Sequence, residues 1–133
     1  MSKLEQISDI ITKYFGTTVN SVKSPTRVAN VRNARHLICY FAKTDLRLTF
    51  LEIAEWMGGR DHTTAMNSCR QVRNSLNTQT YLYDDFNNLR EEVYKIAYKG
   101  HMSLVIKSDP NVDVKGIVSE IRQTYPHVTF LIA

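Results

Sequence analysis

The sequence is poor in the residues from which metal sites and disulfide-stabilised folds are built. Its 133 residues include two cysteines, Cys39 and Cys69, which are too few for a disulfide framework and too far apart for a zinc knuckle. The four histidines show no ligand spacing either: His36, His62, His101 and His127. We therefore expect no metal and no other cofactor, and we interpret both cysteines as core residues in a reducing cytoplasm.

Long apolar runs are also missing. No stretch is long enough to span a bilayer, and residues 1–5 lack the apolar centre of a secretory signal. Hydrophobic residues make up 43% of the chain and charged residues 23%, which are ordinary values for a globular protein. The sequence therefore favours one cytoplasmic domain with its own core, no membrane partner and at most a small appendage.

Two common catalytic arrangements are absent from the sequence. It contains no glycine-rich P-loop ending in Lys-Ser or Lys-Thr, so we expect no ATPase activity. Asp61 and His62 are adjacent, so their side chains cannot easily face each other, and the spacing positions no nucleophile beside them. We therefore expect that the protein is not an enzyme.

Positive charge is concentrated in the middle of the chain. The net charge is +4, with nine Lys and Arg against four acids between residues 20 and 75, whereas three bases balance three acids from residue 100 onward. Such a concentration suits a phosphate backbone as partner. A solvated helical face can carry a similar excess, so charge alone leaves both interpretations open.

Apolar residues recur at helical spacing through most of the chain. The pattern predicts a helix over residues 3–15 that Gly16 ends, and a turn or loop at residues 20–25. Four further helices are expected at about 31–44, 49–57, 61–76 and 81–98. Thr49 and Glu52 have the spacing of a capping box at the start of one of them.

The pattern changes after residue 100. Strands are expected at 103–107 and 128–132 on either side of a helix at 114–125, which is the length of a minimal parallel crossover. We therefore divide the chain into a helical domain, residues 1–99, and a strand–helix–strand tail, residues 100–133.

The stretch GGRDHTT, residues 58–64, is the most informative part of the sequence. Its two glycines mark a tight turn between helices, and the next helix opens with Asp61, His62, Thr63 and Thr64. In a major groove, Asp61 can accept from a cytosine amino group, the Thr63 methyl can pack on a thymine methyl, and His62 and Thr64 can bond a base edge or a phosphate. Alternatively, Asp61 only caps the helix, and the residues alone leave both interpretations open.

The same stretch resembles the signature of the C-terminal DNA-binding domain (domain IV) of DnaA, the bacterial chromosomal replication initiator. The likeness covers roughly residues 5–98, including Tyr14-Phe15 in the lead-in helix, residues 33–43 in the long helix and residues 49–57 before the turn. The resemblance implies a mainly α, Trp-repressor-like helix-turn-helix bundle. It also implies sequence-specific binding of double-stranded DNA at DnaA boxes of replication origins.

The resemblance assigns roles by position. Asp61, His62, Thr63 and Thr64 match the residues that read bases in the major groove. Arg27 matches the basic-loop arginine that enters the minor groove, where narrow A·T-rich DNA attracts a guanidinium. Phosphate contacts are expected from four further residues: Arg35, Lys43, Thr49 and Arg60.

Several positions depart from the family pattern. Pro25, Thr26, Ala29 and Asn30 dilute a loop that is usually rich in Lys and Arg. Three further differences are Leu51 in place of a proline, Asn67 in place of a histidine, and Met57 in place of the aromatic residue before the glycines. Fewer phosphate contacts predict weaker binding with a shallower salt dependence. The alternative is a protein–protein interaction or regulatory module that kept the fold and lost its DNA specificity.

The resemblance does not extend to the tail, and the AAA+ ATPase that precedes this domain in a full initiator has no counterpart in the sequence. We therefore expect a stand-alone DnaA-box-type binder or a fragment of a longer protein, with replication proteins as further partners. Two strands and one helix cannot bury a sheet alone. The tail must pack on the last helix of its own chain or pair with a second copy as a homodimer.

Overall fold

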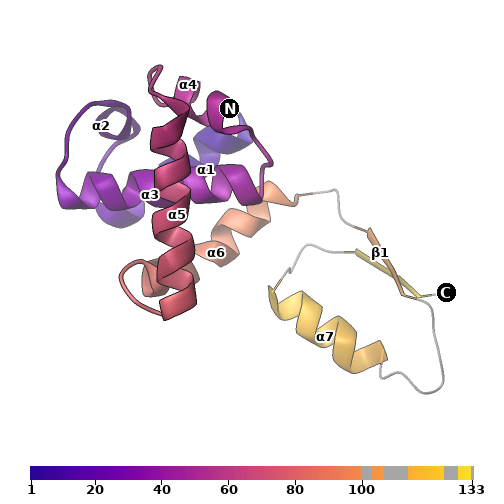
Figure 1. The fold of residues 1–133 in the computed structure, drawn as a ribbon. Coiled ribbons are helices and arrows are strands. Elements are labelled where there is room, and N and C mark those ends of the chain that lie inside the picture. Colours follow the sequence, from indigo (N-terminus) through magenta and orange to yellow (C-terminus); the bar gives the residue numbers. More distant parts are fainter. Residues whose placement is uncertain (100–102, 107–113, 125–128, 133) are drawn as a thin grey trace.

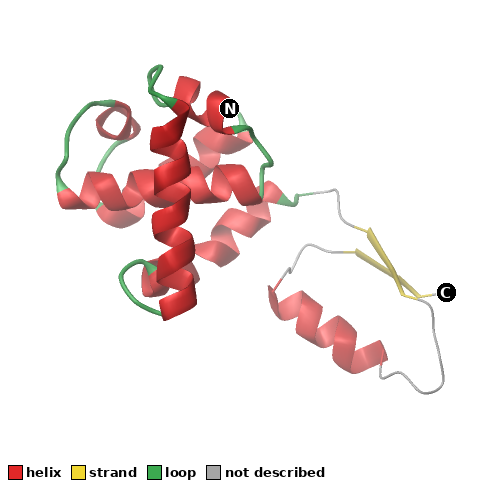
Figure 2. Cartoon of the chain, viewed as in Figure 1, coloured by secondary structure: helices red, strands yellow, loops and turns green. Residues whose placement is uncertain are grey.

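A computed structural model describes residues 1–99, 103–106, 114–124 and 129–132 of the chain. Residues 1–99 are mainly helical, and short loops join consecutive helices (Figure 2). The helices are α1 (Lys3–Phe15), α2 (Val19–Lys23), α3 (Ala29–Thr44), α4 (Phe50–Trp56), α5 (His62–Thr78) and α6 (Tyr83–Ala97). The mainly α architecture predicted from the sequence is therefore confirmed for this part of the chain.

Helix α3 is the centre of the bundle. Helices α1, α2, α4 and α5 all pack against it, and α5 crosses it in Figure 1. The largest side chains that are fully buried include Ile7, Ile11, Leu37, Ile38, Phe41, Ile53, Met57, Leu82, Val72 and Val93. The rings of Phe41 and Phe86 stack with their centroids 5.1 Å apart, which joins α6 to α3. This shared core fixes the position of α5, whose N-terminus carries the GGRDHTT residues.

The helix ends follow local signals in the sequence. Helix α1 begins after Ser2, whose hydroxyl accepts from the Glu5 amide, and it ends at Gly16 with φ of 70°. At the start of α4, Thr49 Oγ1 accepts from the Glu52 amide at 3.1 Å, and Glu52 Oε1 accepts from the Thr49 amide at 3.3 Å. The predicted helix over residues 3–15 and the predicted capping box are confirmed.

The prediction of a turn or loop at residues 20–25 is wrong for residues 20–23 and correct for Ser24 and Pro25. Residues Val19–Lys23 form α2, and Thr18 caps it by accepting from the Ser21 amide at 3.2 Å. A helix of five residues is too short to show apolar periodicity, and only Val22 is buried within it. The proline at position 25 ends this helix but does not prevent it.

The double glycine forms the tight turn expected between α4 and α5. Gly58 and Gly59 have φ of 95° and 78°, a region that L-residues with side chains rarely adopt. The amides of Gly59 and Arg60 both donate to the Ala54 carbonyl, at 3.2 and 3.1 Å. These bonds satisfy the C-terminal end of α4 and turn the chain directly into α5.

The two glycines should differ in their tolerance of a methyl group. A Cβ on Gly58 would lie 3.3 Å from the Lys23 carbonyl oxygen, whereas a Cβ on Gly59 would meet nothing within 4 Å. A side chain at positive φ costs about 1–2 kcal/mol at either position, and Gly58→Ala is expected to lower the free energy of unfolding by more than Gly59→Ala because of the added contact. Urea unfolding of both variants checks this, and equal losses would show that the contact with Lys23 is unimportant.

In the tail, the structure describes β1 (Ser103–Ile106), α7 (Val114–Thr124) and β2 (Thr129–Ile132). The strands pair in parallel, from Ser103 opposite Thr129 to Ile106 opposite Ile132. The predicted boundary at residue 100 and the status of the tail as a folded unit remain predictions. Among the residues described, no helix is both long and apolar enough to cross a membrane.

Candidate nucleic-acid interface

Asp61 is the N-cap of α5. Its Oδ1 accepts from the Thr63 amide at 3.0 Å, while 67% of its side chain stays exposed. The bond from the Thr63 backbone is the main reason that the pKa of Asp61 is lowered, so the carboxylate is ionised at neutral pH. The capping geometry considered above is thus present. It does not preclude contact with a base, because an ionised carboxylate can accept about four hydrogen bonds.

His62 and Asp61 approach each other, contrary to the expectation that adjacent side chains cannot easily do so. His62 Nδ1 lies 3.3 Å from Asp61 Oδ1, because Asp61 is extended just before the helix begins. Thr63 is exposed beside them and Thr64 is partly buried. Within the described part of the chain, no group of three His, Cys, Asp or Glu could hold a metal. The N-terminus of α5 therefore presents polar side chains to solvent.

Arg35 was expected to contact a phosphate, but its side chain is buried. Only 7% of the residue is exposed. Its Nε donates to the Val22 carbonyl at 3.1 Å, and its Nη2 donates to the carbonyls of Ser24 and Thr26 at 3.0 and 3.2 Å. Burial, followed by the charge of Arg60, lowers the pKa of Arg35. Its role in the structure is to hold the α2–α3 loop, so we no longer assign it to a phosphate.

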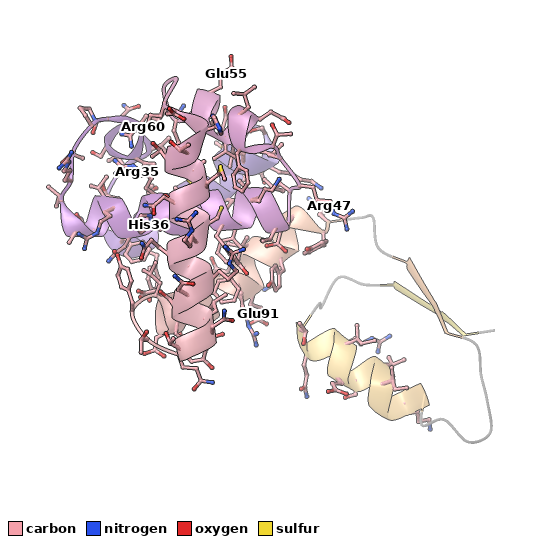
Figure 3. The ribbon with its side chains drawn as sticks, viewed as in Figure 1. Arg35, His36, Arg47, Glu55, Arg60 and Glu91 are labelled. Atoms are coloured by element: carbon pink, nitrogen blue, oxygen red, sulfur yellow. The ribbon has the colours of Figure 1, made fainter. Side chains whose placement is uncertain are left out.

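Arg60 holds the same loop as well. Its Nη2 donates to the Ser24 carbonyl, which Arg35 also bonds, and Figure 3 shows both arginines on the same side of α5. Lys23, just before this loop, lies with its Nζ 4.6 Å from the centre of the Trp56 ring. The loop is thereby fixed to α3, α4 and the turn before α5. Sequence reasoning missed this role, because two arginines far apart in sequence converge on one carbonyl only in the folded chain.

The tethered loop carries Arg27, which is exposed. It follows Thr26, whose carbonyl accepts from Arg35, so the backbone beside Arg27 is held in place while its side chain faces solvent. The loop and the N-terminus of α5 are joined directly through Arg60. The structure therefore brings together the two elements that were expected to read bases.

The remaining phosphate candidates differ in their surroundings. Lys43 is half-buried, with its Nζ 4.5 Å from the centre of the Phe50 ring. Thr49 is exposed, but its hydroxyl lies 3.0 Å from Glu52 Oε1 in the capping box. The Thr49 hydroxyl is thus engaged in the capping box, and its contact with a phosphate stays a prediction. Lys43 and Arg60 are also kept as candidates.

Stability is expected to fall in acid because of His36, which packs between α3 and α5. Its Nδ1 lies 2.9 Å from Ser68 Oγ. Burial, and then the charges of Arg32 and Arg35, lower the pKa of His36 from 6.5 to about 4. The folded state favours neutral imidazole, so the stabilisation is complete above pH 6.5 and is lost as pH falls toward 4. Urea midpoints of the wild type and His36→Gln between pH 7 and 4 check this. The same pH slope in both proteins would contradict it.

A capped seven-residue helix, a double-glycine turn and a longer helix with exposed polar residues at its start define a helix-turn-helix domain. A family model described as "Bacterial dnaA protein helix-turn-helix" matches residues 4–72, which is more than half of the chain. The chain therefore belongs to the bacterial DnaA helix-turn-helix family.

Individual relatives support the same family. The chain is 34% identical over 89 residues to "Chromosomal replication initiator protein DnaA" of Spiroplasma citri, covering 67% of this chain and 20% of that protein. The protein of the same name from Rhodopseudomonas palustris (strain HaA2) is 31% identical over 91 residues, covering 68% of this chain and 19% of the relative. The chain thus matches about a fifth of the length of these relatives.

Proposed function

We propose that this chain binds double-stranded DNA sequence-specifically, at sites similar to the DnaA box of replication origins. The observation that carries the proposal is the start of α5, where Asp61, His62 and Thr63 are exposed beside the tethered loop of Arg27. The GGRDHTT stretch is uninterrupted, and the curated relatives are named as chromosomal replication initiators.

In this proposal, α5 enters the major groove with its N-terminus foremost. Asp61, His62, Thr63 and Thr64 contact base edges there, and Arg27 reaches into the adjacent minor groove. Lys43 and the remaining donors of Arg60 add contacts to backbone phosphates. Because this chain contains no P-loop, its part in initiation is DNA binding without ATP hydrolysis.

Titration of a labelled DnaA-box duplex against a scrambled duplex at moderate salt tests the proposal. The box is expected to bind more tightly, and the amide signals of residues 60–64 are expected to shift in NMR spectra. Equal affinity for both duplexes would overturn sequence specificity. Unshifted signals with DNA, together with shifts on adding a protein partner, would favour the interaction module instead.

We also propose that two tails pair to form a homodimer. The described strands β1 and β2 pair only with each other, so each has an outer edge that another strand can extend. Light scattering of the full chain and of a chain lacking residues 101–133 tests this. A monomer at high concentration, unchanged by the deletion, would overturn it.

A further inference from the structure

A polar hollow of about 450 Å³ lies between α3 and α5, and none of its lining residues has been assigned a DNA contact so far. We call it the α3–α5 hollow. It is lined by Arg32, His36, Asn67, Gln71 and Tyr81. Asn67 and Gln71 follow Thr63 on α5 at intervals of four residues, so all three lie along one face of the helix. The hollow therefore continues the surface that begins with the proposed base-reading residues.

The electrostatics of the α3–α5 hollow favour an anion. Arg32 is exposed at its edge, and none of the five lining residues carries negative charge. His36 is neutral, because burial lowers its pKa and the charges of Arg32 and Arg35 lower it further. Both arginines therefore act on His36 as nearby positive charges. A phosphate entering the hollow would meet a guanidinium together with neutral amide donors.

Tyr81 forms one wall of the hollow in an unusual backbone conformation. Its φ of 49° is rare for a bulky residue, and Gln79 two residues earlier has φ of 54°. The Tyr81 hydroxyl donates to Asn33 Oδ1 at 2.5 Å, which joins the α5–α6 turn to α3. Backbone strain of this kind persists where the surroundings hold the residue in place, so the wall is a fixed part of the surface.

We propose that the α3–α5 hollow binds one backbone phosphate of the duplex whose major groove α5 enters, with Arg32 as the charged ligand. The inference rests on the proposed function for the presence of the duplex. Continuity with the Thr63 face favours DNA over an acidic protein segment, because a helix in the major groove is flanked by phosphates on both sides. Asn67 and Gln71 supply neutral donors along that face.

The test compares Arg32→Gln with Arg90→Gln, which removes the same charge from an exposed position on α6 that does not line the hollow. Affinities for the box and scrambled duplexes are measured over a range of salt concentrations, after urea unfolding has shown both variants to be folded. Arg32→Gln is expected to weaken both complexes about 3–10-fold and to reduce the slope of log K against log salt by about 1. The ratio of box to scrambled affinity should stay constant, and Arg90→Gln should leave the slope unchanged.

Replacing single phosphates of the box by neutral methylphosphonates locates the contact. One replacement is expected to weaken the wild type but not Arg32→Gln. Equal slopes for the two variants, or a changed base preference in Arg32→Gln, would overturn the phosphate assignment. The proposed function is judged separately, by whether the wild type prefers the box. Absence of binding to either duplex would overturn both proposals.

Discussion

Arg35→Ala is expected to lower the free energy of unfolding by about 3 kcal/mol. The side chain is 7% exposed, and its guanidinium satisfies the carbonyls of Val22, Ser24 and Thr26. Removing it takes this donor from the carbonyls of Val22 and Thr26, leaves Ser24 with Arg60 alone, and opens space between α2 and α3. Each buried acceptor left unsatisfied costs about 1–3 kcal/mol, although some carbonyls will regain water once the loop moves.

Arg35→Lys should restore little of this loss. A lysine ammonium carries the charge but cannot reproduce the planar set of donors that reaches three carbonyls from one group. The matched control is Arg90→Ala on the exposed surface of α6, which should change stability by less than about 0.5 kcal/mol. Urea unfolding followed by circular dichroism measures all three variants. Full rescue by lysine would mean that charge, and not the donor geometry, stabilises the loop.

The same variant should affect DNA binding indirectly. Arg27 lies on the loop that Arg35 holds, so Arg35→Ala lets the exposed guanidinium occupy more orientations before binding. Ordering it again on DNA costs conformational entropy, which weakens the complex even though Arg35 itself touches no phosphate in our assignment. Residues buried behind an interface can thus resemble contact residues in a mutational scan.

Prediction from the sequence succeeded where the structure depends on local signals. Helix α1, the start of α4 and the turn before α5 depend on short-range signals, which are Gly16, the Thr49–Glu52 pair and the double glycine respectively. Such signals act within a few residues, so they can be read directly from the chain. The family resemblance rests on the same kind of contiguous stretch, and the matched region confirms it.

The sequence was a less complete guide where the surroundings of a residue are set by the fold. A basic residue such as Arg35 suggests a phosphate ligand from its sequence, yet the carbonyls it bonds belong to a loop that only the fold places beside it. Thr49 was given a phosphate role as well as a cap, and only the structure shows the Glu52 carboxylate against its hydroxyl. Helix α2 was missed because its single buried residue, Val22, cannot show the helical periodicity of apolar residues.

Base recognition itself remains a proposal, and the double variant Arg27→Ala/Thr63→Ala tests it most severely. Each change is expected to weaken the box complex by about 1–3 kcal/mol. The two side chains lie on different elements, the α2–α3 loop and α5, and are expected to contact different grooves, so their effects should add. The double variant should therefore lose about 2–6 kcal/mol of box affinity, which is on the order of 30-fold to 10⁴-fold.

The fold should tolerate both changes. Arg27 and Thr63 are exposed, the bond from the backbone amide of residue 63 to the Asp61 cap survives truncation of the Thr63 side chain, and alanine is a good helix former. The matched control, Thr78→Ala/Arg90→Ala, makes the same two changes at exposed positions away from the proposed contacts. Affinity for the scrambled duplex should fall far less in the double variant, because Thr63 contributes only through bases. Equal losses on both duplexes would show that these residues supply general attraction for DNA, and specificity would have to come from elsewhere on the molecule.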